Sequence, residues 1–304
     1  MKMISNIVFT KNRPLQLEAY LESLYRYFPR EIIQTYIIYK VELFDEQYGL
    51  LFQKFPDCVV IRENDFHSDF LQTLGQVSTK YILFGVDDVV YFDSVDFEVI
   101  DESFNRFPDD IFGFSLRHSP QNAKACETVD KIFAGGQRVY KMNWQDIKEY
   151  PFELCATVYR TELVKSITNN VKNNNWLARK MFSPGSILIK MLGESKHRRK
   201  ILKHFGYFYA PNNLESWSCR WCQNNASNFP AYLFYQKYCA AAIQVNIVNT
   251  STVNKSEDIP EFSVEVLAEK YKQGYRLDID FIAENKPTGA LCENLKFRLM
   301  ENQL

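Results

Sequence analysis

The sequence predicts an α/β fold whose central sheet is mostly parallel and carries helices on both faces. Short apolar runs alternate with amphipathic stretches over residues 4–120, and polar clusters follow directly after two of the apolar runs. Continuous apolar runs are typical of strands covered on both sides, and their alternation with helices is typical of parallel sheets. With 304 residues, of which 46% are hydrophobic, the chain can bury such a sheet.

The first helix follows the first strand directly. Pro14 stands at a first helical position, where its missing N–H has no intrahelical partner to lose, and apolar residues recur at Leu17, Leu21 and Leu24 until Pro29 ends the helix. The other elements expected in this half are helices over Asp69–Val77 and Phe97–Phe107 and strands over Ile7–Phe9, Thr35–Tyr39, Cys58–Ile61, Tyr81–Val86 and Ile111–Leu116.

The second half of the chain is less regular. Phe229–Ile243 is a long apolar run that we expect to form a helix, and Gln244–Asn254 alternates apolar and polar residues as a half-buried strand does. Residues 256–304 are more charged, and we expect them to form a C-terminal extension with a weakly structured tail.

Charge and composition exclude some functions. The chain carries 36 Lys+Arg against 37 Asp+Glu, so it has no overall field to recruit nucleic acid, and we expect no nucleic-acid partner. The N-terminus lacks the continuous apolar stretch of a signal peptide, and no later segment reaches the apolar length that spans a bilayer. Seven cysteines, mostly inside apolar runs, are typical of buried thiols in a reducing compartment. We therefore expect a cytoplasmic protein.

Two carboxylates, Asp87 and Asp88, follow the apolar run Tyr81–Val86. Adjacent carboxylates at the end of a buried strand repel each other and are costly to desolvate. A divalent cation relieves this repulsion, and Mg²⁺ or Mn²⁺ needs few other protein ligands when a substrate supplies phosphate oxygens. The alternative is a solvated strand end in which the pair caps a turn.

A second polar cluster, Thr10–Pro14, lies between the first strand and the first helix. A helix start offers free backbone N–H groups, and Lys11 and Arg13 add positive charge, so the cluster suits a nucleotide or a diphosphate. An ordinary helix cap with exposed basic residues is the alternative. Because ligands of parallel sheets bind beyond the carboxyl ends of the strands, both clusters are expected at one rim of the sheet.

These residues carry a resemblance to a known family. The opening IVFTKNRPLQLEAYLESL, the later segment DFHSDFLQTLGQVSTKYILFGVDDVVYF and the spacing between them resemble GT-A-fold nucleotide-sugar glycosyltransferases, especially bacterial family-2-like and exostosin-like enzymes. The resemblance is clear over residues 4–120 and fainter to residue 255. It implies a glycosyltransferase domain over residues 1–255, with a nucleotide-binding half at 1–120 and an acceptor half at 121–255, followed by the extension at 256–304.

The resemblance also implies an activity and a set of site residues. The protein would transfer a sugar from a nucleoside-diphosphate sugar, with a UDP-sugar favoured, to a glycan or glycolipid acceptor with the help of Mn²⁺ or Mg²⁺. Asp88 would be the principal metal ligand, and Asp87 would support the ribose or the metal. The other implied donor residues are Thr10, Asn12 and Arg13 in the nucleoside pocket and Asp65 or Asp69 near the base or ribose.

The sequence departs from the family pattern in one respect. Val86 precedes the two acids and Val89 follows them, so no third acid completes a strict Asp-x-Asp motif. This departure leaves the division of labour between Asp87 and Asp88 open. In the family a late residue, commonly a histidine, completes the metal or diphosphate site, and Asn249 is a weak substitute in this chain.

The acceptor half offers fewer signals. Glu153 and Glu215 each lie near a turn after an apolar or aromatic run, and either could act as the general base that an inverting transferase needs. Arg117 follows a predicted strand, where it could neutralise a leaving diphosphate. Structural glutamates and a solvated loop arginine are the alternatives for these three residues.

A basic run and two rival functions complete the sequence-based picture. Lys196–His204 could contact an anionic membrane surface, peripherally at the inner face, or a lipid-diphosphate acceptor, whereas a solvated helix face is the alternative. One rival function is a nucleotidyltransferase, which usually carries a Gly-rich phosphate loop, but the first twenty residues contain no glycine. The other is a catalytically degenerate nucleotide-sugar-binding protein, which the missing third acid permits.

Overall fold

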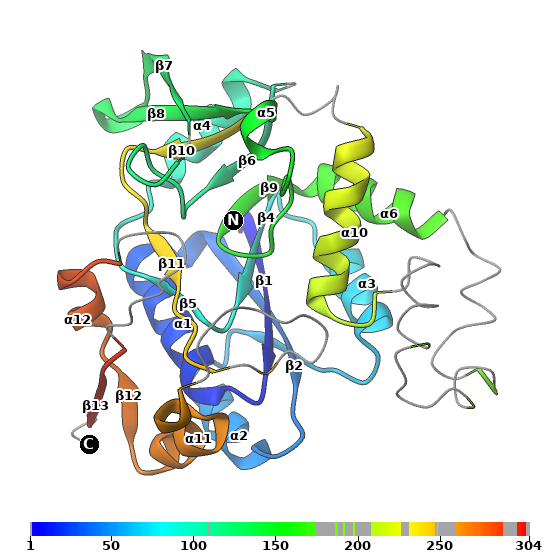
Figure 1. Cartoon of the computed structure of the whole chain (residues 1–304), viewed down its shortest axis with the longest axis vertical. Coiled ribbons are helices and arrows are strands. Elements are labelled where there is room, and N and C mark those ends of the chain that lie inside the picture. Colours follow the sequence, from blue (N-terminus) through cyan, green and yellow to red (C-terminus); the bar gives the residue numbers. More distant parts are fainter. Residues whose placement is uncertain are drawn as a thin grey trace.

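A computed structural model describes most of the chain (Figure 1). The described residues are 2–108, 110–123, 125–173, 186–187, 191, 197, 208–225, 231–246, 248, 259–287 and 297–301.

The core of the molecule is a sheet of nine strands in the order β3-β2-β1-β4-β9-β6-β10-β8-β7. Strands β1, β2, β3 and β4 pair in parallel, and so do β6 and β10. Only β8 and β9 are antiparallel to both of their neighbours, so the other seven strands run in one direction. The strands are β1 (Ile4–Lys11), β2 (Ile33–Lys40), β3 (Val59–Arg62), β4 (Tyr81–Val86), β6 (Ile111–Ser115), β7 (Glu127–Ile132), β8 (Arg138–Asn143), β9 (Thr157–Arg160) and β10 (Ala231–Tyr235).

Helices cover both faces of the sheet, and each face has its own apolar cluster. One face carries α1 (Pro14–Tyr27), α2 (Asp45–Lys54) and α4 (Phe97–Arg106). The other face carries α3 (Phe66–Gln76), α5 (Trp144–Ile147), α6 (Thr161–Asn173) and α10 (Pro211–Asn224), and Figure 1 shows α3, α6 and α10 together on that side. The predicted α/β fold with a mostly parallel sheet and helices on both faces is confirmed.

The first helix forms as its sequence predicts. Pro14 begins α1, and Leu17, Leu21 and Leu24 are fully buried against the sheet. Burying each leucine side chain stabilises the fold by about 1.5 to 3 kcal/mol, so this stripe holds α1 against the sheet. It thereby fixes the turn that precedes Pro14.

The expected helix over Phe229–Ile243 is wrong. Ala231–Tyr235 forms β10, and Ala240–Ala242 forms β11, which pairs with β5 (Val89–Tyr91) in a separate two-stranded sheet. All residues of both strands are buried, so the apolar run has no polar face to reveal its period. The segment Ala210–Asn213, which could pass for a turn because of its proline, instead begins α10.

The C-terminal residues dock on the first helix. The extension contains a 3-10 helix (Pro260–Phe262), α11 (Val264–Lys272), β12 (Tyr275–Leu277), α12 (Ile279–Glu284) and β13 (Leu299–Glu301). Glu18 of α1 is fully buried and accepts hydrogen bonds from Arg276 (2.6 Å), Lys54 (2.7 Å) and the Tyr271 hydroxyl. Leu267 also joins the apolar cluster of α1, so the described part of the extension packs against the main body.

Candidate active site

The turn after β1 is held from three sides. Asn12 has a φ of +54°, a left-handed conformation that asparagine tolerates better than most residues, and its backbone N–H donates to the carbonyl of Lys40 (3.1 Å). The Tyr48 hydroxyl of α2 hydrogen-bonds to Thr10 Oγ1 (2.8 Å) and accepts from the backbone N–H of Arg13 (3.0 Å). The Asn12 amide oxygen accepts from the backbone N–H of Glu42 (2.9 Å). These bonds join the carboxyl ends of β1 and β2.

The two aspartates after β4 meet this turn. The Arg13 guanidinium donates from Nη1 to Asp87 Oδ1 (2.9 Å) and lies 3.6 Å from Asp88 Oδ2. The backbone N–H of Lys11 donates to Asp87 Oδ2 (3.3 Å), so both carboxylate oxygens of Asp87 have protein donors. The two polar clusters of the sequence therefore lie together at one rim of the sheet, as strands β1 and β4 are adjacent and parallel.

Asp88 is the less compensated of the two acids. Its Oδ1 atom is buried and has no hydrogen-bond partner among the described residues. Burial raises the pKa of Asp88 to about 6, and Asp87 adds to the rise while Arg13 and Arg117 oppose it. A buried carboxylate oxygen without a donor is costly unless a ligand satisfies it.

The described residues could coordinate a divalent cation with Asp88 as the main protein ligand, but they do not supply a full set of protein ligands. No group of three or more His, Cys, Asp or Glu side chains that could hold a metal occurs in the part of the chain that the structure describes. Mg²⁺ and Mn²⁺ are commonly held by one or two carboxylates together with substrate phosphates. Asp88 Oδ1, which has no partner among the described residues, could bind such a cation directly. Asp87 could bind the same cation only by losing its hydrogen bond to Arg13 or to Lys11.

A second buried ion pair lies beside the first. Arg117, two residues after β6, donates to Glu153 Oε2, and Glu153 Oε1 accepts from the Thr157 hydroxyl. Ser115 also approaches Glu153 Oε1 (3.4 Å). Burial acts to raise the pKa of Glu153, but Arg117 and then His118 outweigh it and hold that pKa below its ordinary value. Glu153 is thus a well-compensated carboxylate, whereas the buried Nε of Arg117 has no partner among the described residues.

Glu215 approaches the same region from α10. It accepts from the backbone N–H of Leu154 (2.8 Å) and from the Tyr150 hydroxyl. Burial raises the pKa of Glu215, and the hydrogen bonds from Tyr150 and Leu154, followed by the charge of Arg117, only partly offset the rise. Arg117 interacts electrostatically with Asp88 and with Glu215. The candidate residues of the two halves of the chain are therefore close enough to influence one another's charge.

The backbone between these groups is strained. Ala156, next to β9, has a φ of +47°, which is uncommon for a residue with a Cβ. Its N–H donates to the carbonyl of Phe84 (2.9 Å) and its carbonyl accepts from Leu116 (2.9 Å), so hydrogen bonds to β4 and to the end of β6 hold it in this conformation. Such strain is more frequent at functional sites than elsewhere.

Asp65 and Asp69 shape the start of α3. Asp65 caps the helix by accepting from the backbone N–H of Ser68 (3.1 Å), and Asp69 Oδ2 accepts from the N–H groups of Asn64 (2.8 Å) and Asp65 (2.9 Å). They follow β3, whose carboxyl end lies at the same rim as that of β2. Their expected proximity to a base or ribose stays a prediction, as do the individual roles of the other candidate residues.

Sequence reasoning missed several residues of this site. Tyr48, Glu42 and Ser115 carry no motif, because each becomes relevant only through contacts with a distant strand or turn. The expected strand over Gln244–Asn254 is wrong for its described residues, 244–246 and 248, which form no strand. Asn246 lies in this segment, and its side chain accepts from Arg13 Nε (2.8 Å). Asn249 and the basic run, apart from His197, lie outside the described residues.

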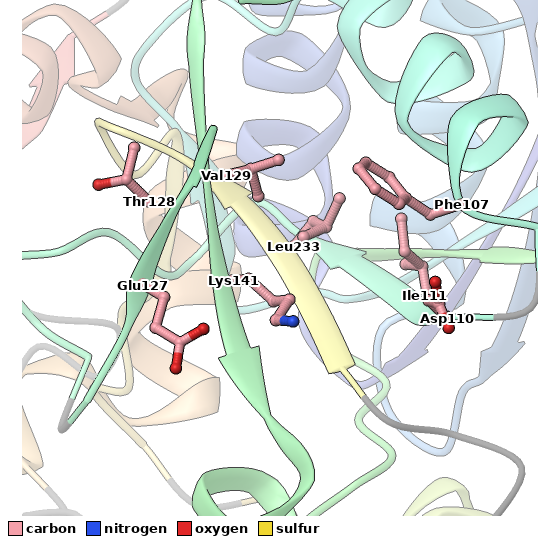
Figure 2. A pocket seen from close by; sticks show the side chains of 8 residues that line it. All are labelled: Phe107, Asp110, Ile111, Glu127, Thr128, Val129, Lys141 and Leu233. Carbon is pink, nitrogen blue, oxygen red and sulfur yellow. The ribbon is translucent and has the colours of Figure 1, made fainter. Parts of the chain in front are cut away.

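A separate cavity of about 280 Å³ lies at the opposite end of β6. Ile111 opens that strand and lines the cavity, whereas Arg117 follows the strand at its other end. No candidate site residue lines this cavity, whose lining side chains Figure 2 shows around β7, β8 and β10. The lining residues are Phe107, Asp110, Ile111, Glu127, Thr128, Val129, Lys141 and Leu233.

The chain is similar to known glycosyltransferases. It is 28% identical over 193 residues to the bifunctional glycosyltransferase pgtA of Dictyostelium discoideum, a match that covers 54% of this chain and 25% of that protein. The chain thus spans about a quarter of that relative's length. No family model matches the chain. The similarity to pgtA confirms the resemblance to glycosyltransferases that the motifs indicated.

Two solved structures are among those to which the chain is similar. S. aureus TarS 1-349 in complex with UDP has a TM-score of 0.38 and 18% identity, covering 56% of this chain and 49% of that one. The mannosyltransferase PcManGT from Pyrobaculum calidifontis, in complex with GDP-Man and Mn²⁺, has a TM-score of 0.35 and 10% identity, covering 74% of this chain and 75% of that one.

Within the described residues, no helix is both long enough and apolar enough to cross a membrane.

Proposed function

We propose that the protein transfers a sugar from a nucleoside-diphosphate sugar, a UDP-sugar being favoured, to a glycan or glycolipid acceptor. The observation that carries the proposal is the convergence of Arg13, Asp87, Asp88 and Arg117 at the carboxyl rim of the sheet, where one buried Asp88 oxygen has no partner among the described residues. The sequence similarity to pgtA supports the same reaction class.

The donor would bind across the turn after β1. Thr10 and Asn12 would line the nucleoside pocket beside Tyr48, and Asp65 or Asp69 would lie near the base or ribose. Asp88 would hold Mn²⁺ or Mg²⁺ against the diphosphate, and such an ion supplies Lewis-acid stabilisation of the leaving group. The carboxyl-end position of these residues supports the assignment, since ligands of such sheets bind there.

The second half would serve the leaving group and the acceptor. The buried Nε–H of Arg117, which has no partner in the part of the chain that the structure describes, could donate to a diphosphate oxygen as charge develops there. Of the two candidate bases, Glu215 is the better one, because burial raises its pKa above the ordinary value of a glutamate whereas Arg117 lowers that of Glu153, and a more basic carboxylate takes a proton more readily. Glu153 already accepts from Arg117 and Thr157, which favours a structural role for it.

One alternative function has a specific observation in its favour. Both oxygens of Asp87 accept hydrogen bonds from the protein, so within the described residues Asp88 Oδ1 is the oxygen of the pair that is left for a ligand. A catalytically degenerate nucleotide-sugar-binding protein would retain such a site.

The sequence also predicts where the protein is located. We propose that it lies in the cytoplasm and contacts the membrane peripherally through Lys196–His204.

An assay of nucleotide release separates these functions. The protein is incubated with UDP-, GDP- and CDP-sugars and Mn²⁺, with and without glycan acceptors, and free nucleoside diphosphate is measured. Release by the wild-type protein that is lost in Asp88→Asn supports the transferase. Binding of a nucleotide sugar without any release from it, with or without acceptor, would instead establish the degenerate binding protein.

A further inference from the structure

Asn246 hydrogen-bonds to the two nitrogens of the Arg13 guanidinium that do not contact Asp87. The Asn246 amide oxygen accepts from Arg13 Nε (2.8 Å), and its backbone carbonyl accepts from Arg13 Nη2. Both residues are buried, at 3% and 7% exposure, although they are 233 positions apart in the sequence. Two parallel bonds to the planar guanidinium fix its orientation as well as its position.

The same guanidinium reaches the diacid with its remaining nitrogen. Nη1 donates to Asp87 Oδ1 (2.9 Å), and the backbone N–H of Lys11 donates to Asp87 Oδ2 (3.3 Å). Burial acts against the charge of Arg13, but Asp87 and then Asp88 outweigh it and raise the pKa of Arg13. We call Asn246, Arg13 and Asp87 the Arg13 clasp.

Asn246 is itself held from two directions. Its amide nitrogen donates to the carbonyl of Phe262 (2.7 Å), at the start of the C-terminal extension. Three residues earlier, the backbone N–H of Ile243 donates to the carbonyl of Asp88 (2.7 Å). The segment after β11 is therefore hydrogen-bonded both to the diacid and to the extension.

We propose that Asn246 is a positioning residue for the donor site. The clasp orients Asp87 as a fixed counter-ion of Arg13, so that Asp88 presents its free oxygen to the metal–diphosphate group of the donor. This division of labour follows from the contacts, since Asp87 has a donor on each oxygen and Asp88 Oδ1 has none among the described residues. The inference rests on the proposed nucleotide-sugar function.

Three variants test the role of Asn246. Asn246→Ala removes both side-chain bonds, Asn246→Asp keeps the oxygen that accepts from Arg13 Nε, and Asn6→Ala is a matched control. Asn6 is a fully buried amide on β1 that bonds to Thr35 (3.4 Å) and Tyr20 (2.6 Å) but not to the clasp. Each protein is titrated calorimetrically with UDP, GDP and CDP in the presence of Mn²⁺, and its thermal unfolding is recorded.

The expected result separates positioning from general stability. Asn246→Ala should weaken binding of the nucleotide that the wild-type protein binds by about ten-fold or more, because a hydrogen bond to a charged group is lost. Asn246→Asp keeps the acceptor for Arg13 Nε but places an oxygen against the Phe262 carbonyl, so it should lower the melting temperature and still retain more of the affinity than Asn246→Ala. Asn6→Ala should lower the melting temperature without lowering the affinity. Wild-type affinity in a folded Asn246→Ala protein would overturn the role of the clasp. So would an equal loss of affinity in Asn6→Ala.

The wild-type titration distinguishes a failure of this inference from a failure of the proposed function. If the wild-type protein binds none of the three nucleotides, the proposed function falls and the inference falls with it. If the wild-type protein binds one of them and Asn246→Ala binds it equally well, only the inference about Asn246 falls.

Discussion

Arg13 and Arg117 are the two buried arginines of the candidate site, and they are compensated differently. Arg13 faces two carboxylates, Asp87 at 2.9 Å and Asp88 at 3.6 Å, whereas Arg117 pairs with Glu153 alone by direct contact. One guanidinium in contact cannot neutralise two acids, and the pKa of Asp88 is raised to about 6 although the more distant Arg117 also opposes the rise, so the first cluster keeps an excess of negative charge. The second cluster is balanced, and Thr157 completes the hydrogen bonding of its acid.

The difference indicates that the first cluster could bind a ligand and that the second cluster stabilises the fold. An excess buried charge with an unpartnered oxygen is a site that a cation or a donor group can complete. A balanced buried pair with satisfied acid oxygens is expensive to break and gives its carboxylate little capacity to take a proton. The first half of the chain would therefore bind the donor, and the Arg117–Glu153 pair would hold the two halves in register.

The largest effect is expected from breaking the balanced pair. Glu153→Ala leaves Arg117 buried without its partner, which should lower the free energy of unfolding by about 3 to 5 kcal/mol. Urea denaturation measures this change. Asp57→Ala, which breaks the exposed pair of Asp57 with Arg30, is the control and should change stability by less than about 1 kcal/mol. A loss in Glu153→Ala that is as small as the loss in Asp57→Ala would show that the Arg117–Glu153 ion pair contributes little to stability.

The two candidate bases should respond differently in steady-state kinetics. Glu215→Gln is expected to lower kcat by about a hundred-fold or more while the nucleotide affinity stays near the wild-type value, as the loss of a general base predicts. Glu153→Gln should chiefly lower stability. A kcat that survives in Glu215→Gln and collapses in a folded Glu153→Gln protein would exchange their roles.

Asp88→Asn should leave the fold at least as stable as in the wild-type protein. Because burial raises the pKa of Asp88 to about 6, its ionised form opposes folding at neutral pH. Removing that charge should raise the free energy of unfolding by about 1 to 3 kcal/mol. Thermal unfolding at pH 7.5 and at pH 5 checks the sign, since the gain should shrink at pH 5, where Asp88 is protonated. A clear destabilisation at pH 7.5 would contradict the excess-charge description of this cluster.

The smallest effect concerns acid stability. The pKa of Glu153 lies below its ordinary value, so its contribution to stability is present above about pH 4.3 and is lost as the pH falls through its lower folded-state pKa. Glu153→Gln should therefore show a shallower loss of stability in acid than the wild-type protein does. Urea midpoints measured from pH 5 to pH 3 would reveal an unchanged slope if Glu153 did not contribute.

The regular part of the fold could be predicted from the sequence, and so could the meeting of its two polar clusters. The stripe of α1 and the apolar run of β4 have clear periods and lengths, and adjacent parallel strands must end at one rim. The strands β10 and β11 could not be predicted, because both faces of each are buried and the run looks uniformly apolar. Asn246 could not be assigned either, since its partner Arg13 lies 233 positions away.

The most direct test of the central claim is a calorimetric titration of the wild-type protein and of Asp88→Asn with UDP, GDP and CDP, each with and without Mn²⁺. We predict that the wild-type protein binds one nucleotide, UDP being favoured, that Mn²⁺ strengthens the binding, and that Asp88→Asn loses the metal-dependent part. Failure of all three nucleotides to bind a well-folded wild-type protein would contradict the claim that this rim of the sheet is a nucleotide-sugar site.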